Sequence, residues 1–230
     1  MLLLTAALVA FVGSHFLLSH AGRAPMVRSL GEGRFSIVYS AVALVTFGGA
    51  LAAWRRAPID RLWTAPDFAW IIAALLMFVA SVLFIGSVSA PNPALMGGGA
   101  RGGGGGPRGV LRITRHPMMW AFALWAVVHA VLSGEARTVI LCAAVLTLAL
   151  VGARLQDGKK RAQRGDGWAA HEAATGFVPF AAQFGGRQPW SSLYPGVVAL
   201  VGGAALYAVL TWSHPALMHA PELGLWRSLS

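Results

Sequence analysis

Two histidines in one apolar stretch are the first residues whose type and spacing suggest chemistry. His116 belongs to a basic start, Thr114-Arg115-His116-Pro117, and His129 lies thirteen positions further on inside the hydrophobic run. A helix would separate the two rings by roughly 20 Å along its axis, at 1.5 Å per residue. His15 lies in another apolar run near the start of the sequence. Because an ionisable ring inside a membrane span is costly unless something uses it, His15 and His129 are candidates for metal ligation or proton transfer.

A structural role is the alternative for these two rings, since buried polar side chains often form hydrogen bonds to a neighbouring helix. Two imidazoles from different helices could instead hold a haem iron, which commonly takes histidine ligands. Alternating helix directions would place His15 and His129 on opposite sides of mid-helix, each by roughly 6 Å. His15 with His116 is therefore a second possible pair, and it matches better in depth. The remaining histidines are interpreted as interfacial rings with a wet polar edge: His20, His171, His214 and His219.

The Arg115-His116-Pro117 start suggests a site for a negative charge. Proline is common at the first helical position, and the free N–H groups of a helix start attract anions. The pattern favours a propionate, phosphate or carboxylate there, and a plain helix cap is the alternative. No clustered histidine, cysteine and glutamate spacing predicts a zinc site, and no G-x-S-x-G element predicts a hydrolase.

The composition indicates a membrane protein. Hydrophobic residues make up 57% of the 230 residues, charged residues only 11%, and the mean hydropathy is +0.64. A soluble domain carries about 25% charged residues. The net charge of +10 comes from Lys and Arg in short loops between apolar runs, which suits an anionic leaflet and not a nucleic acid. The single cysteine, Cys142, excludes a disulfide within the chain.

The fold class predicted from this pattern is all-α, a polytopic bundle of about six apolar segments in a single membrane domain, 1–230. A span needs about 20 apolar residues, and the fourth and fifth segments are short enough to form a helical hairpin that need not fully cross. A four-span core with a re-entrant hairpin is the alternative. The segments are 2–20, 35–54, 68–90, 117–133, 137–154 and 193–213.

Basic residues predict the orientation of this bundle. With six crossings, thirteen Lys and Arg lie on one side and five on the other. An excess of positive charge marks the cytoplasm, so both termini are expected on the non-cytoplasmic side. The first segment lacks the basic residues of a secretory signal and is expected to stay as a span.

Two segments between the apolar runs are not expected to cross the membrane. Residues 96–109 are a Gly-rich flexible linker, and 155–192 form a cytoplasmic polar segment. In the latter, the fifth helix should continue to Gln163, glycines at 165 and 167 should break it, and Trp168–Ala174 should form a short helix.

Four short elements together resemble the NnrU family and are similar to the 15-cis-zeta-carotene isomerases. They are Gly31-Glu32-Gly33-Arg34-Phe35-Ser36-Ile37-Val38-Tyr39-Ser40, Thr114–Trp120, Trp125–His129 and Thr175-Gly176-Phe177-Val178-Pro179-Phe180. The resemblance implies a protein of the inner or plasma membrane. Its isomerase branch implies haem b held by two histidines, which fall on His15, in Gly13-Ser14-His15, and on His129.

The same resemblance implies two kinds of function. One is a redox-dependent cis–trans isomerase of a lipophilic polyene that enters from the bilayer. Ala126 stands where that branch has a cysteine, three residues before the second ligand, so no thiolate is present there. The other is a non-catalytic factor for the expression of nitrite and nitric oxide reductases or for haem maturation.

A looser likeness connects the chain with isoprenylcysteine carboxyl methyltransferases. It rests on an Arg-His-Pro helix start, a hairpin, and a charged segment that ends in Pro179-Phe180. It implies S-adenosylmethionine bound near Arg115 and His116. The acidic part of that segment is replaced here by Gln156-Asp157-Gly158-Lys159-Lys160.

Overall fold

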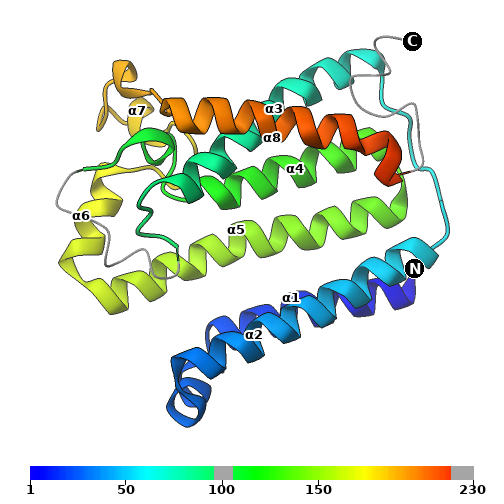
Figure 1. Cartoon of the computed structure of the whole chain (residues 1–230), viewed down its shortest axis with the longest axis horizontal. Coiled ribbons are helices and arrows are strands. Elements are labelled where there is room, and N and C mark those ends of the chain that lie inside the picture. Colours follow the sequence, from blue (N-terminus) through cyan, green and yellow to red (C-terminus); the bar gives the residue numbers. More distant parts are fainter. Residues whose placement is uncertain (96–105, 219–230) are drawn as a thin grey trace. The chain divides into compact units, whose positions relative to one another are not determined.

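The computed structural model describes residues 1–95 and 106–218. Every regular element within these two ranges is a helix, as Figure 1 shows, which confirms the predicted all-α class. Most of the predicted linker 96–109, together with His219, lies outside the described residues. The described chain forms two compact units. One contains Met1–Ala65 and His129–Leu155, and the other contains Pro66–Val128 and the residues from Gln156 onward.

The first unit is built on the helical pair α1 and α2. Helix α1 spans Leu2–Ser19, and α2 spans Arg23–Arg56. Helix α2 begins well before the predicted segment 35–54, and its backbone leaves the helical region at Gly31, with φ 78° and ψ 160°. The basic and polar residues before position 35 are therefore helical although they are not apolar. A cluster of Leu4, Leu8, Ala50, Ala53 and Leu141 forms the core of this unit.

The fourth and fifth apolar segments are joined by two residues, as expected for a hairpin. Helix α4 spans Pro117–Ser133 and α5 spans Ala136–Arg164. The N–H of Leu62 donates to the carbonyl of Gly134 at 2.7 Å, and that of Ala136 donates to Asp60 at 2.9 Å. The loop after α2 therefore holds this connection through backbone hydrogen bonds.

The second unit contains the closely packed pair α3 and α8. Helix α3 spans Asp67–Ser89 and α8 spans Val197–Met218. Small residues let the two backbones approach, as is usual in membrane helix packing. A methyl group on Gly203 would lie 2.7 Å from the Cα of Val82, closer than real Cβ atoms come to another heavy atom. Glycine is thus required at this contact.

Short helices follow the end of α5 and carry the polar segment. The left-handed backbone of Gly165 (φ 50°) separates α5 from α6, which spans Asp166–Ala174. Gly167 lies inside α6, so the expectation that it also breaks the chain is wrong: the single left-handed residue already turns it. The remaining short elements are η1 (Gly109–Arg112), α7 (Ala181–Phe184) and η2 (Trp190–Ser192).

Within the described residues, five helices are long and apolar enough to cross a membrane, and α4 is a shorter apolar helix. The five are α1, α2, α3, α5 and α8. This set defines a polytopic helical membrane protein, in agreement with the composition.

We expect Gly203→Ala to lower the free energy of unfolding by about 1–3 kcal/mol, the usual cost of inserting a group into a packed interior. The measurement is the unfolding midpoint in detergent, followed by circular dichroism. Gly48→Ala in α2 is the matched control, because no atom beyond the adjacent backbone of its own helix lies within 4 Å of its added Cβ. Equal midpoints for the two variants would contradict the close α3–α8 contact.

Candidate functional site

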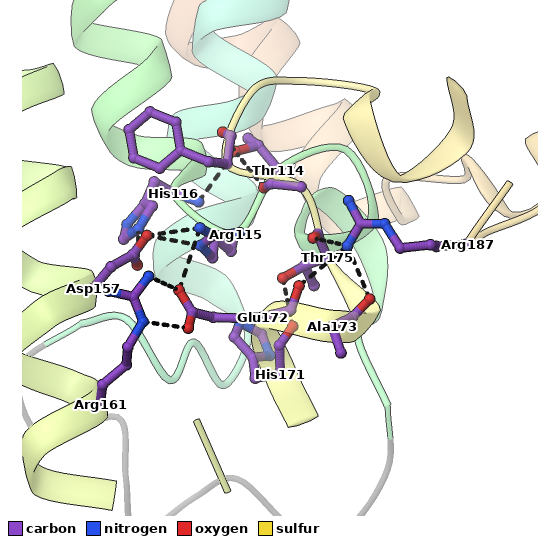
Figure 2. Close-up of polar contacts among 12 residues, drawn as sticks. Thr114, Arg115, His116, Asp157, Arg161, His171, Glu172, Ala173, Thr175 and Arg187 are labelled. Atoms are coloured by element: carbon purple, nitrogen blue, oxygen red, sulfur yellow. Dashed lines mark hydrogen bonds and ion pairs between the residues drawn. The ribbon is translucent and has the colours of Figure 1, made fainter. Parts of the chain in front are cut away.

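A buried carboxylate, Asp157 near the end of α5, is the centre of the polar site (Figure 2). Its Oδ2 accepts hydrogen bonds from Arg115 Nε at 3.0 Å and Arg115 Nη2 at 2.8 Å. Its Oδ1 lies 2.6 Å from His116 Nε2. Asp157 is fully buried, and His116 is only 3% exposed. The two adjacent basic residues at the start of α4 therefore bind one acid that is distant in sequence.

Backbone hydrogen bonds fix the segment that carries these basic residues. The N–H of Arg115 donates to the carbonyl of Gly176 at 2.8 Å, and the N–H of Phe180 donates to Ile113 at 2.8 Å. The Thr114 hydroxyl donates to the carbonyl of Phe177 at 2.6 Å. Residues 113–116 and 176–180 thus hold each other before α4 begins at Pro117.

Glu172 on α6 adds a second acid on the other side of Arg115. Arg115 Nη2 lies 3.4 Å from Glu172 Oε1, and the Arg161 guanidinium donates to both Glu172 oxygens at 2.7 Å (Figure 2). The Arg115 guanidinium also lies over the ring of Phe177, 5.5 Å from its centroid. Such planar, multiply bonded contacts suit arginine better than lysine. Arg115 is held from three directions and has little freedom to move.

The last carbonyls of α6 are held by another arginine. Arg187 Nη1 donates to the carbonyls of Glu172 at 3.2 Å, Ala173 at 2.9 Å and Thr175 at 2.8 Å. A cation at a helix C-terminus satisfies carbonyls that have no partner within the helix and interacts favourably with the helix dipole.

The anion expected at the start of α4 is supplied by the chain itself. Arg115 and His116 bind Asp157 and Glu172, so a bound propionate or phosphate would have to displace these carboxylates. A carboxylate beside an imidazole fixes its tautomer and orientation, as in acid–base pairs. The edge of the His116 ring meets Phe177 at a centroid distance of 5.5 Å. In this conformation the pair joins α4, α5 and α6 and presents almost no surface to a substrate.

His171 on α6 is not the wet interfacial ring expected from sequence. Its Nε2 is buried and has no hydrogen-bond partner, and its ring lies 5.1 Å from that of the buried Trp168. Burial first, and the charge of Arg115 second, lower the pKa of His171 to about 4. The expectation is wrong because α6 places the His171 ring beside Trp168 and near Arg115, so that its Nε2 does not reach water.

His15 lies in the other unit and has a different environment. The Tyr39 hydroxyl on α2 and His15 Nε2 on α1 are 2.5 Å apart and share a hydrogen bond. His15 Nδ1 is buried and has no partner. One ring nitrogen is therefore oriented by a neighbouring side chain, while the other lacks a partner inside an apolar helix.

His129 lies in α4, is half-buried, and belongs to the same compact unit as His15. Ala126, one turn earlier, is buried. The pairing of His15 with His129 at one iron stays a prediction. Within residues 1–95 and 106–218, no group of three His, Cys, Asp or Glu side chains forms a metal cluster.

Three residues that shape these sites escaped the sequence analysis: Asp157, Glu172 and Tyr39. The scarcity of acidic residues could have pointed to Asp157 and Glu172, because the chain has only eight Asp and Glu against eighteen Lys and Arg. An acid placed within a turn or two of an apolar helix end is a natural partner for a buried arginine. Tyr39 belongs to one of the quoted motifs, but its hydroxyl contact with His15 joins two different helices.

The fold gives the structural class of this protein, and a match to a family model gives its family. The helices and the capping polar segment define a polytopic α-helical membrane protein. The family model described as NnrU protein matches residues 3–222, so the chain belongs to the NnrU family. No curated protein matches the chain, and no solved structure does.

We expect Asp157→Asn to lower the free energy of unfolding by about 3–5 kcal/mol, because removal of one partner leaves a buried charge uncompensated. Denaturant titration in detergent measures the change. Asp166→Asn is the control, since this exposed acid at the start of α6 should contribute less than about 1 kcal/mol. A cost for Asp157→Asn no greater than that of the control would contradict the role given to the carboxylate.

The lowered pKa of His171 predicts a dependence of stability on pH. The unfolded chain binds a proton at His171 below about pH 6.5, but the folded protein does so only near pH 4. The contribution of His171 to the free energy of unfolding is therefore fully present above about pH 6.5 and is lost as the pH falls toward 4. Unfolding midpoints between pH 7.5 and 4.5 should fall less steeply for His171→Gln than for the wild type. Identical slopes would show that His171 titrates alike in both states.

Proposed function

We propose that this NnrU-family membrane protein binds haem b, which His15 and His129 would hold. The observation that carries the proposal is the state of the His15 ring. Metal-binding histidines use one ring nitrogen for the metal, while a neighbouring group binds and orients the other. Tyr39 binds Nε2 of His15, and the buried Nδ1 has no partner. The residues present at His15 thus fit a metal ligand.

The surroundings of His15 also suit a lipophilic cofactor. Phe11 lies edge-on to the ring at 5.7 Å, and the Tyr39 ring lies at 5.0 Å. Apolar and aromatic walls with few polar groups are typical of sites for flat, lipophilic ligands. In such a setting the imidazole would bind the iron and the Tyr39 hydroxyl would keep the ring oriented.

As a reaction we propose redox-dependent cis–trans isomerisation of a lipophilic polyene. Haem would supply a redox-active iron when bound. The chain's own residues have two roles in this proposal. His15 and His129 hold the cofactor, and the apolar helices keep water from a substrate that enters from the bilayer. The proposal rests on the resemblance to the carotene isomerases for its substrate class and on His15 for its cofactor.

The polar site around Asp157 favours the haem proposal over a methyltransferase. S-adenosylmethionine near Arg115 and His116 would require their pairs with Asp157 and Glu172 to open, and these pairs are nearly buried. The contacts of Arg115 and His116 with Asp157 and Glu172 keep α4, α5 and α6 together whether or not a cofactor binds elsewhere.

The test is an absorption spectrum of the purified protein in detergent, before and after dithionite. We expect a Soret band and sharp α and β bands on reduction, and their loss in His15→Ala and in His129→Ala. Tyr39→Phe should weaken haem affinity at least about tenfold, because it removes the group that orients the ligand. His214→Ala, in α8, is the control and should keep the spectrum of the wild type.

A second assay separates an enzyme from a maturation factor. Reduced, haem-loaded protein mixed with a cis-configured carotenoid should give new isomers by chromatography, and the oxidised protein should not. Loaded protein without isomerisation, but with transfer of haem to an apo-acceptor, would favour the maturation factor. A colourless protein that binds S-adenosylmethionine would overturn the haem proposal and favour the methyltransferase.

A further inference from the structure

A basic surface pocket of about 480 Å³ lies in the second unit, and its lining does not include Asp157, Arg115 or His116. Its lining contains three arginines and no carboxylate. The lining residues are Gly106, Pro107, Arg108, Arg112, Ala174, Arg187, Gln188, Pro189 and Ser192. Three guanidinium groups without a counter-charge among their neighbours define a site for an anion.

The arginines are positioned by the fold but keep donors for a ligand. Arg112 donates from Nε to Pro107 at 2.9 Å and from Nη1 to Ser192 at 3.2 Å, which leaves Nη2. Arg187 uses Nη1 alone for the carbonyls of α6, which leaves Nε and Nη2. Arg108 is exposed, and its side chain has no hydrogen bond or ion pair with any described residue. Two arginines held by hydrogen bonds and one exposed arginine suit the recognition of a tetrahedral oxyanion.

The pocket lies at the end of a membrane span. Ser192 precedes the first residue of α8, Val197, by five positions, so at most about 18 Å of extended chain separates them. Phe184 is 80% exposed and Trp190 is 52% exposed, and their rings meet at 5.0 Å. Exposed aromatic rings beside basic residues are typical of the boundary between the headgroups and the acyl chains.

We propose that the pocket formed by Arg108, Arg112 and Arg187 binds the phosphate of an anionic phospholipid headgroup. The pocket volume falls in the range of about 300–1,000 Å³ that is usual for small-ligand sites, enough for a glycerophosphate group. Phe184 and Trp190 would lie against the upper acyl chains of the same lipid. A free phosphate has the same charge but gains nothing from these rings, which is why the lipid is the favoured source.

The bound lipid would hold the polar segment against the membrane. Arg187 binds the end of α6 and lines the pocket, and Arg112 joins η1 to the chain just before α8. A headgroup phosphate shared by both arginines would tie α6, η1 and η2 to one leaflet. This inference does not depend on haem binding at His15.

The test uses the full chain in neutral detergent and counts bound lipid by native mass spectrometry. The probes are phosphatidylglycerol, phosphatidylcholine and inorganic phosphate. We expect phosphatidylglycerol to bind roughly tenfold more tightly than phosphatidylcholine and to resist displacement by millimolar phosphate. Arg108→Glu should reduce phosphatidylglycerol binding at least tenfold. Because the side chain of Arg108 has no described protein partner, the variant should fold as the wild type does.

Arg28→Glu is the matched control. Arg28 is exposed, its side chain has no described hydrogen-bond or ion-pair partner, and it lies outside the pocket, so phosphatidylglycerol binding should stay within twofold of the wild type. A salt titration of the unmodified protein gives an independent readout, since phosphatidylglycerol affinity should fall between 50 and 500 mM salt. Equal binding of the two lipids, equal loss in both variants, or displacement by phosphate alone would overturn the proposal.

Discussion

The carboxylate of Asp157, paired with Arg115 and His116 almost out of reach of water, is the interaction on which the polar half of this protein depends. An ion in such a place is tolerated only when partners replace its hydration. Each partner is therefore held by further contacts: residues 113–116 are bonded to 176–180, and Glu172 joins Arg115 to Arg161. The start of α4, the end of α5 and the whole of α6 are constrained together, although no apolar surface alone would orient them.

The membrane-spanning helices depend on a different kind of constraint. Apolar side chains gain nothing by leaving lipid for another helix, so close contact between helices comes from shape. Gly203 facing Val82 is the clearest case, because a single methyl group would keep α3 and α8 apart. The small side chains at such a contact set the distance between the two helices. The charged contacts of the polar segment instead select which residues meet.

The two chemical environments of the histidines follow from these constraints. His116 is buried against Asp157 within a network of the chain's own polar groups, where it stabilises the fold. His15 is held by a single hydroxyl in an apolar setting, where its second nitrogen has no partner. The NnrU family model matches residues 3–222, so both histidines lie within the matched region, and the match does not say which of them has which role. The two rings therefore differ in the number of polar partners that their surroundings provide.

The sequence by itself determined where the apolar helices lie, that a short connection joins α4 to α5, and that α6 follows α5. Hydrophobic runs, prolines and glycines act locally, so these features are readable within a window of a few turns. Asp157 meets His116 across 41 positions, and Tyr39 meets His15 across 24. The burial of the His171 ring and the start of α2 before position 35 were likewise seen only in the structure. Only the tertiary structure decided these pairings, because a side chain's partner depends on which helix faces end up opposite each other, and local sequence does not encode that.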